Sequence, residues 1–242
     1  MNISTIIPTY QEENYIEETL FYLAKAKSVA KSNGIESEII VVDSGYDGTF
    51  NIAKRNAKKV FKFKERGVSK ARNFGASKSS GDILLFMDAD TIVPANFFEE
   101  VIKTFRDDGV VGAVSYVLPC KPHSISAFEK LFYKLDRTFI KQCANCQLFL
   151  RYYTRCNAVA VRREIFFKVG GFNPQFNIME VTELILKVSK FGKIAVLRYP
   201  VYDAERRIKQ WGPIKSYLVW LKNFAPYQLI RRPIDEHYEV VR

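Results

Sequence analysis

The sequence predicts an α/β fold in which a mostly parallel, Rossmann-like sheet is flanked by helices and followed by an amphipathic C-terminal extension. Two observations lead to this prediction. Short β-branched runs alternate with segments of helical spacing, which is the order of a parallel sheet with crossover helices. The expected strands also read as continuous apolar runs, as strands do when helices cover both faces of a sheet.

The expected elements begin with a β-α-β unit whose strands are predicted at 2–8 and 38–43. The helix between them is predicted from the spacing of Ile16, Leu20, Leu23 and Ala24. Further strands are predicted at 60–63, 83–87, 110–118, 158–161 and 194–197. Further helices are predicted at 68–77, 95–106, 126–153, 164–169 and 180–191, and a last one from Pro213.

The net charge of +11 is concentrated in two stretches. Residues 54–78 hold ten Lys and Arg against one acid, and residues 121–163 hold nine against two. Such stretches suggest an anionic partner, namely a nucleotide diphosphate, a phospholipid surface or nucleic acid. A solvated basic face is the alternative for either stretch alone.

The N-terminal residues lack the basic and long apolar regions of a secretory signal, so we expect a cytoplasmic protein. No window has the 18 or so apolar residues of a membrane-spanning helix. Any attachment to the cytoplasmic membrane face is therefore expected to be peripheral. The cysteines are Cys120, Cys143, Cys146 and Cys156. A zinc site or a disulfide is the alternative for these cysteines, but their spacing favours buried free thiols.

Polar groups follow three of the expected strands directly. These are Pro8-Thr9-Tyr10, Asp43 and Asp88-Ala89-Asp90. Ligands of open α/β sheets bind at the carboxyl ends of strands, so the three groups are expected to converge. Mg²⁺ and Mn²⁺ choose carboxylate oxygens and share them with substrate phosphates, although an Asp-x-Asp alone also arises by chance or as a helix cap.

The region around this Asp-x-Asp resembles the family 2 glycosyltransferases. The matching motifs are Ala71-Arg72-Asn73-Phe74-Gly75 and the run from Gly81 to Asp90. Upstream, STIIPTYQEENYIEETL and EIIVVDSGYDGT are similar to the family's first two strand ends, and downstream VRREIFFKVGGFNPQF is similar to its acceptor-side segment. The resemblance covers about residues 3 to 200.

The resemblance implies a GT-A fold that uses a UDP- or GDP-sugar with Mg²⁺ or Mn²⁺ and inverts the transferred sugar. Residues 1–204 would form this domain, with a nucleotide-sugar-binding half at 1–118, an acceptor half at 119–204 and the extension at 205–242. The implied donor site contains Pro8, Tyr10, Glu12 and Asp43 around the base and ribose, Arg72 and Asp82 near the nucleotide or ordering the site, and Asp88, Ala89 and Asp90 at the ribose, diphosphate and metal.

Some implied roles have structural alternatives. Arg72 and Asn73 would otherwise only begin a surface helix. Asp203 is expected to be a further metal ligand, or else to pair with Arg206 or Arg207. The segment RRIKQWG, with Arg207 and Trp211, resembles one that closes over the diphosphate, or else is a solvated linker.

The catalytic base is where the sequence departs from the family. Inverting members place a Glu-Asp pair after the Gly-Gly-Phe turn, whereas this chain has Glu180 followed by Val181. Glu183 lies three residues further and would share a helix face with Glu180. Glu180 is favoured as the base, Glu183 is second, and a chain without a competent base is the third possibility.

The last predicted helix places Tyr217, Leu218, Leu221 and Phe224 near one face, with Lys215 and Lys222 beside it. Together with the aromatic and basic segment 126–153, it predicts a surface lying in a membrane interface, suited to a polyprenyl-phosphate-linked or glycan acceptor. A core or dimer contact is the equal alternative.

Two other functions compete with sugar transfer. One is a catalytically weak protein that binds nucleotide sugars without the Asp base. The other is nucleic-acid binding, suggested by the pI of about 9.4 but not expected, because the sequence has no recognised motif for it and its strand-end acids would be unexplained.

Overall fold

The computed structural model describes residues 1–120, 157–204 and 206–235, and the single positions 130, 131, 134, 135, 138, 139 and 142. Within the last range, the side chains of residues 207, 208, 213, 214 and 217 are not described. Most of the predicted helix 126–153 therefore lies outside the described residues, as do Cys143, Cys146, Cys156 and the side chain of Arg207. Cys120 is a free thiol.

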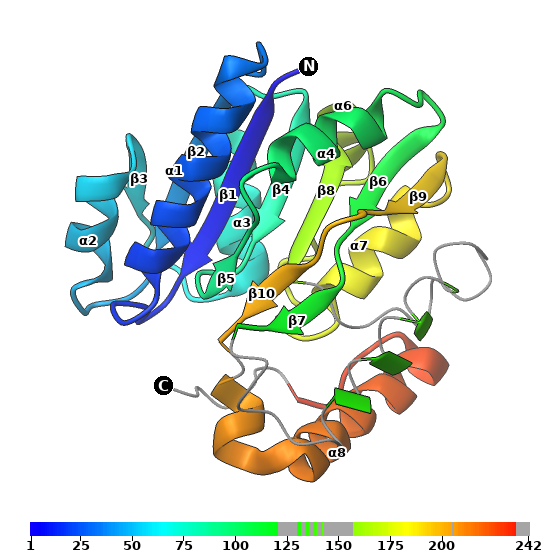
Figure 1. The fold of residues 1–242 in the computed structure, drawn as a ribbon. Helices are drawn as coiled ribbons and strands as arrows, with labels where there is room; N and C mark the ends of the chain where they lie inside the picture. Colours follow the sequence, from blue (N-terminus) through cyan, green and yellow to red (C-terminus); the bar gives the residue numbers. More distant parts are fainter. Residues whose placement is uncertain are drawn as a thin grey trace.

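A seven-stranded sheet forms the centre of the molecule (Figure 1). Its strands, in spatial order, are β3 (Lys59–Lys62), β2 (Ser37–Asp43), β1 (Ile3–Thr9), β4 (Ile83–Met87), β8 (Ala158–Arg162), β6 (Val110–Val114) and β9 (Lys193–Val196). Strand β8 runs antiparallel to both of its neighbours, and the other pairs are parallel. The predicted mostly parallel sheet is confirmed.

A second, three-stranded sheet lies below the first and consists of β5 (Thr91–Ile92), β10 (Val201–Asp203) and β7 (Val117–Pro119). The single strand predicted at 110–118 is therefore two strands, β6 and β7. The chain changes sheets at Ser115 and Tyr116, where the Ser115 amide bonds to Ala158 and the Tyr116 carbonyl accepts from Val201. Strands of two or three residues show no periodicity, so β5 and β10 were not predicted.

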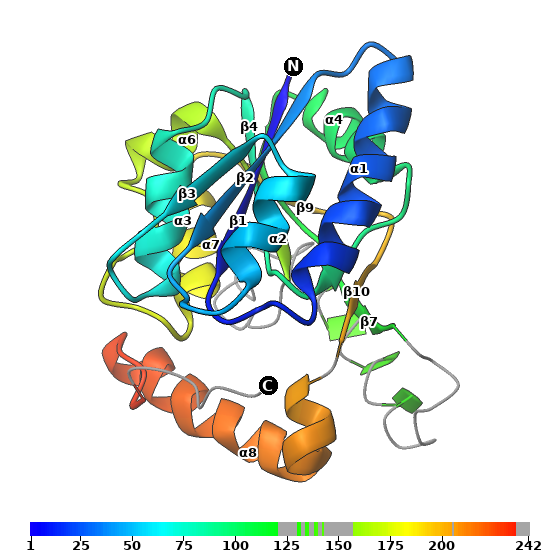
Figure 2. The same ribbon diagram turned by 90° about the vertical axis from the view of Figure 1, so that its left-hand side faces the viewer.

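Helices cover both faces of the central sheet (Figures 1 and 2). They are α1 (Ile16–Ser32), α2 (Thr49–Asn56), α3 (Val68–Ser77), α4 (Phe97–Phe105), α6 (Arg163–Lys168) and α7 (Glu180–Val188). Side chains alternate along β1, so that Ile3 and Ile7 pack with α1, α2 and α4, whereas Ile6 packs on the face of α3, α6 and α7. The short α2 was not predicted, and Ala24 is exposed, because α1 buries Ala26 instead.

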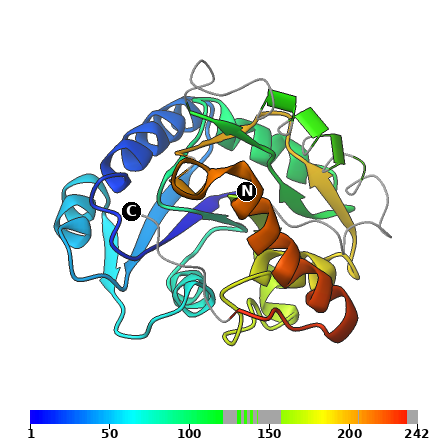
Figure 3. The ribbon, with the colours of Figure 1, turned by 90° about the horizontal axis from the view of Figure 1, so that it is seen from below.

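The extension forms helix α8 (Arg206–Ile230), which crosses the end of the molecule in Figure 3. It was predicted to begin at Pro213 but begins at Arg206, with a break at Gly212, whose φ of 76° is outside the helical region. None of the helices in the described ranges is long and apolar enough to cross a membrane.

Gly75 lets α3 lie close to the sheet. A Cβ at this position would overlap Ile6 Cγ2 and come within 3.2 Å of Val42 Cγ2, both from the buried sheet. We expect Gly75→Ala to destabilise the fold by about 1 to 3 kcal/mol, because overpacking outweighs the helix propensity of Ala. Thermal unfolding measures this, with the exposed Ser77→Ala on the same helix as the control; equal melting temperatures would contradict the packing argument.

Glu38 joins β1, β2 and β3. Its carboxylate accepts hydrogen bonds from Ser4 Oγ (2.6 Å) and the Ser80 amide (2.7 Å) and pairs with Lys59 Nζ (2.6 Å). Burial opposes its charge, but these partners outweigh burial and lower the pKa of Glu38 from 4.5 to about 2.

This lowered pKa predicts a pH dependence of stability. A carboxyl group with a depressed folded-state pKa stabilises the fold above its unfolded value, and that contribution is lost as the pH falls from 4.5 towards 2. Glu38→Gln should remove about 1 kcal/mol at neutral pH and flatten the unfolding free energy in this window. Urea unfolding of both proteins from pH 2 to 7 measures the difference; parallel pH profiles would refute it.

Candidate active site

The carboxyl ends of β1, β2 and β4 meet at one edge of the central sheet (Figure 1). Pro8 and Asp43 lie in the last residues of β1 and β2, and Asp88 and Asp90 follow β4 directly. The turn after β4 is fixed by Thr19 of α1, whose hydroxyl donates to the carbonyl of the buried Ala89 (2.8 Å). Three of the sequence-predicted groups are thus brought to one edge.

Arg72 links this edge to the first turn of α7. Its buried guanidinium binds Asp88 Oδ1 through Nη2 (2.7 Å) and Glu180 Oε1 through Nη1 (2.8 Å). Burial opposes the charge of Arg72, but the two carboxylates outweigh it and raise its pKa. The alternative in which Arg72 only begins a surface helix is therefore wrong.

Asn73 fixes the Gly-Gly-Phe turn that precedes α7. Its side-chain amide donates to the Phe172 carbonyl (2.7 Å), and the Phe172 amide donates back to Asn73 Oδ1 (2.9 Å). Gly171 has a φ of 66°, and a Cβ there would lie 2.7 Å from Asn73 Oδ1. The sequence motif contained Asn73, but no role was predicted for it; here it positions the segment that carries Glu180.

An acidic cluster next to this link is bridged by Arg206. The guanidinium binds Asp90 Oδ2 through Nε (2.9 Å) and Nη2 (2.8 Å) and pairs with Glu12 Oε2 through Nη1 (3.0 Å). It lies 4.6 Å from the ring centroid of Tyr15. The sequence placed Arg206 in the RRIKQWG segment near the diphosphate and as a possible partner of Asp203, but it did not predict the pairing of Arg206 with Asp90 and Glu12.

Both carboxyl groups held by Arg206 have raised pKa values. Burial raises the pKa of Glu12 to about 7, with Arg206 opposing and Asp90 adding to the shift. Burial also raises the pKa of Asp90 to about 6, where the negative charge of Asp203 adds and Arg206 opposes. The cluster therefore carries more negative charge than its buried surroundings accommodate easily.

Asp203 reaches this cluster because β10 pairs antiparallel with β5, which places Asp203 opposite Thr91, the residue after Asp90. The oxygen donors of Asp88, Asp90 and Asp203 suit a hard divalent cation, and the excess negative charge favours one. Within the described part of the chain, no three acidic, His or Cys side chains are placed so that together they could hold a metal ion. An ion here would take further ligands from a phosphate or water.

The nucleotide side of the edge is built from the loops after β1 and β2. Asp43 is buried and accepts from Thr9 Oγ1 (2.9 Å), the Gly45 amide (3.1 Å) and Lys62 Nζ (2.7 Å), so it orders these loops. Tyr10 meets the exposed Tyr46 edge to face and lies beneath the guanidinium of Arg66.

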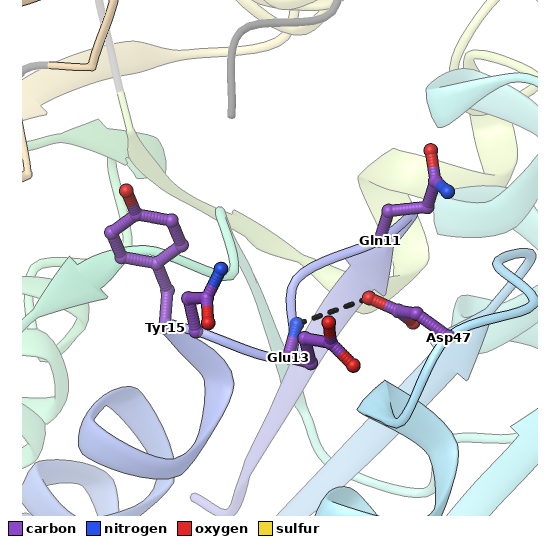
Figure 4. Close-up of a pocket in the computed structure, with 5 residues that line it drawn as sticks. Gln11, Glu13, Tyr15 and Asp47 are labelled. Carbon is purple, nitrogen blue, oxygen red and sulfur yellow. Dashed lines mark hydrogen bonds between the residues drawn. The ribbon is translucent and has the colours of Figure 1, made fainter.

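A small pocket continues this side of the edge. In Figure 4, Gln11 and Tyr15 flank the loop after β1, and Asp47 from the loop after β2 accepts from the Glu13 amide (3.3 Å).

Asp82 does not belong to this edge. It precedes β4 and therefore lies at the amino end of the strand, where its exposed carboxylate accepts from the Asn2 amide (2.8 Å). The prediction that Asp82 lies near the nucleotide or orders the site is wrong, because the whole of β4 separates it from Asp88.

Glu180 and Glu183 are both in the first turn of α7, but they have different surroundings. Glu180 faces Arg72 and the Asp88 side of the site, whereas Glu183 pairs with Lys187 (3.1 Å) and its charge acts on Tyr227 of α8. Val181 is half-buried against the apolar cluster between α7 and the sheet. The structure thus brings Glu180, and not Glu183, to the edge that carries Asp88.

A cleft of about 410 Å³ opens beside the acidic cluster, between α1, β5 and the start of α8. It is lined by Tyr15, Glu18, Thr19, Asp90, Ile92, Cys120, Ala204, Arg206, Lys209 and Gln210. Burial raises the pKa of the Cys120 thiol to about 12, and the nearby carboxylates add to this. Cys120 is therefore protonated and unreactive at neutral pH. Trp211 follows the cleft residue Gln210 in the sequence, and its ring centroid is 5.2 Å from Lys215 Nζ.

The family model described as "Glycosyl transferase family 2" matches residues 4–170. A dolichol-phosphate mannosyltransferase of Pyrococcus furiosus is 30% identical over 141 residues, covering 55% of this chain and 39% of the relative. Glycosyltransferase AglE of Haloferax volcanii is 33% identical over 115 residues, covering 45% and 36%. The chain thus spans less than half the length of these two relatives.

Solved structures share the fold. Mannosyltransferase PcManGT from Pyrobaculum calidifontis, in complex with GDP-Man and Mn²⁺, superposes with a TM-score of 0.63 at 23% identity, covering 82% of this chain and 54% of that one. TarS of Staphylococcus aureus, in complex with UDP-GlcNAc, gives a TM-score of 0.65 at 20% identity, covering 84% and 58%. The predicted GT-A fold is confirmed.

Proposed function

Because the chain belongs to glycosyl transferase family 2, we propose that it transfers a sugar from a nucleoside-diphosphate sugar to an acceptor hydroxyl, with inversion at the transferred carbon. The observation that carries this proposal is the Asp88–Arg72–Glu180 link. It joins the strand-end acids, which suit a donor diphosphate, to a carboxylate on the opposite side that suits an acceptor hydroxyl. The buried guanidinium of Arg72 thereby sets the spacing between the donor side and the acceptor side of the site.

On the donor side, Asp88, Asp90 and Asp203 would hold Mg²⁺ or Mn²⁺, which supplies positive charge to the departing diphosphate. Arg206 adds a second positive charge at the same place, since it is already held by Asp90 and Glu12. Arg207 and Trp211, five residues or fewer from Arg206, stay in the proposal as diphosphate contacts. Pro8, Tyr10, Glu12 and Asp43 form or order the base and ribose side.

On the acceptor side, we assign Glu180 as the general base. Arg72 binds Oε1, and this leaves Oε2 to take the proton of the attacking hydroxyl. Because the pKa of Arg72 is raised, the guanidinium keeps its charge and holds the carboxylate in one orientation. Glu183 is not favoured, since its partners are Lys187 and the Tyr227 region.

For the acceptor we propose a polyprenyl-phosphate-linked or glycan hydroxyl on the cytoplasmic side. The names of two relatives support these classes, a dolichol-phosphate mannosyltransferase and a hyaluronan synthase. The donor base stays open between uracil and guanine, because UDP-GlcNAc and GDP-Man both occur in the similar structures.

A catalytically weak protein that binds nucleotide sugars is the second candidate. Val181 favours it, since this position lacks the carboxylate expected from the family and its side chain packs into the apolar cluster.

Thermal unfolding in the presence of a panel of UDP- and GDP-sugars with Mn²⁺ tests the donor site. A ligand at a hundred times its dissociation constant should stabilise the fold by about 2.7 kcal/mol. The matched control repeats each measurement with EDTA, which should reduce the shift. If no nucleotide sugar stabilises the protein and none is turned over, both candidate functions fail.

A further inference from the structure

Helix α8 turns an apolar stripe towards solvent. Leu218, Leu221, Ala225 and Leu229 follow one another at intervals of three and four residues and therefore share one face. All four are exposed, Leu218 to 56%, Leu221 to 38% and Leu229 to 85%. The opposite face attaches the helix, since Asn223 and Tyr227 are buried there. The stripe is thus not the side by which α8 packs on the protein.

Basic side chains surround this stripe. Lys215, Lys222, Arg231 and Arg232 are exposed on α8 and the turn after it, although Arg231 also lies 5.7 Å from the ring of Tyr227. Asp235 is the one acidic residue of the segment 206–235, and Lys222 and Asn223 both bind it. The apolar surface continues past the helix with the exposed Ile230 and Ile234. Aliphatic side chains rimmed by cations are the chemistry of a helix lying in an anionic membrane surface.

A second stripe has the same character. Leu131, Leu135 and Phe139 lie four residues apart in helical positions and are exposed, and the neighbouring Lys130 and Lys134 are exposed as well. Two separate segments therefore present aliphatic or aromatic side chains next to lysines.

We propose that the outward face of α8 docks on an anionic lipid bilayer, with its leucines among the headgroups and its lysines and arginines at the lipid phosphates. A second copy of the chain is disfavoured as the occupant, because two such faces would bring their cations against each other. Helix α8 lies at the end of the molecule towards which β1, β2 and β4 point (Figures 1 and 2). Docking would therefore bring the candidate active site to the membrane, although the surface itself does not depend on the proposed function.

The test is flotation of the purified chain with vesicles of phosphatidylcholine and phosphatidylglycerol in equal parts, against vesicles of phosphatidylcholine alone. We expect binding to the anionic vesicles that weakens with added salt. The double variant Leu218→Glu/Leu229→Glu should lower the partition coefficient for the anionic vesicles about tenfold or more. The double variant Lys215→Glu/Arg232→Glu should lower it about fivefold or more for each charge.

Phe21→Glu on α1 is the matched control, because it places the same charge at a similarly exposed residue, 54% accessible, outside α8. It should bind vesicles like the unaltered chain, and thermal unfolding should show that every variant is folded. The proposal is overturned if the unaltered chain ignores anionic vesicles, or if the leucine variant binds as well as the control. A dimer by light scattering that becomes monomeric in the leucine variant, without vesicle binding, would assign the face to a second copy.

Discussion

Replacing Asp90 by Asn should lower kcat/KM for sugar transfer by about 100- to 1,000-fold. Asp90 is the carboxylate at which Arg206, Asp203 and Asp88 converge, and the proposed divalent cation would bind there. Asn keeps the shape but removes the charge, so the variant loses electrostatic stabilisation of the departing diphosphate. Steady-state kinetics with the best nucleotide sugar from the panel measures the loss.

The same substitution should not lower the melting temperature. The pKa of Asp90 is raised to about 6 in the folded protein, so its negative charge at neutral pH costs stability. Asp82→Asn is the matched control, since it makes the same change at the other end of β4 and should leave kinetics unchanged. Equal losses in the two variants would show that Asp90 has no special part in transfer.

Glu180→Gln should reduce kcat by about 100- to 10,000-fold while nucleotide-sugar binding persists. The amide oxygen of Gln still accepts a hydrogen bond from Arg72, so the link to Asp88 survives, but the side chain no longer takes a proton. Measuring kcat together with the thermal shift by the donor separates the chemical step from binding. Glu183→Gln, in the same turn of α7, is the control and should have a small effect.

Val181→Asp distinguishes the two candidate functions. If Glu180 is the base, a new carboxylate at position 181 adds little, because this position faces the apolar cluster. A large gain of activity would instead identify the natural chain as a weak transferase that lacks its base. Full activity in Glu180→Gln would likewise reject Glu180 and return the assignment to Glu183.

The fold could be predicted where a strand is buried on both faces. Residues 83–87 form β4 as expected, and the main predicted helices and strands agree within a few residues with the structure. The failures are the unpredicted short elements, the division of 110–118 into β6 and β7, and the start of α8. The two residues of β5 and the three of β10 are held by pairing with each other and with β7, which local sequence does not record.

The site was predicted in part for the same reason. Asp88, Asp90 and Arg72 lie in one contiguous motif, and the end of β4 brings them together. The pairing of Arg206 with Asp90 and Glu12 was missed, because it depends on where helix α8 begins. Asp82 was wrongly predicted to lie near the nucleotide. Asp82 and Asp88 belong to one sequence motif, and the motif alone does not show that strand β4 separates them.

The guanidinium of Arg72 has a consequence for how substitutions combine. Asp88 and Glu180 share it, so removing either carboxylate changes the field that the other one meets. Their effects should therefore be strongly non-additive, with a coupling free energy of about 1 to 3 kcal/mol in a double-mutant cycle. A substitution of Asp88 made to alter donor preference would then also alter the reactivity of Glu180 towards the acceptor, and a substitution of Glu180 would alter the donor side.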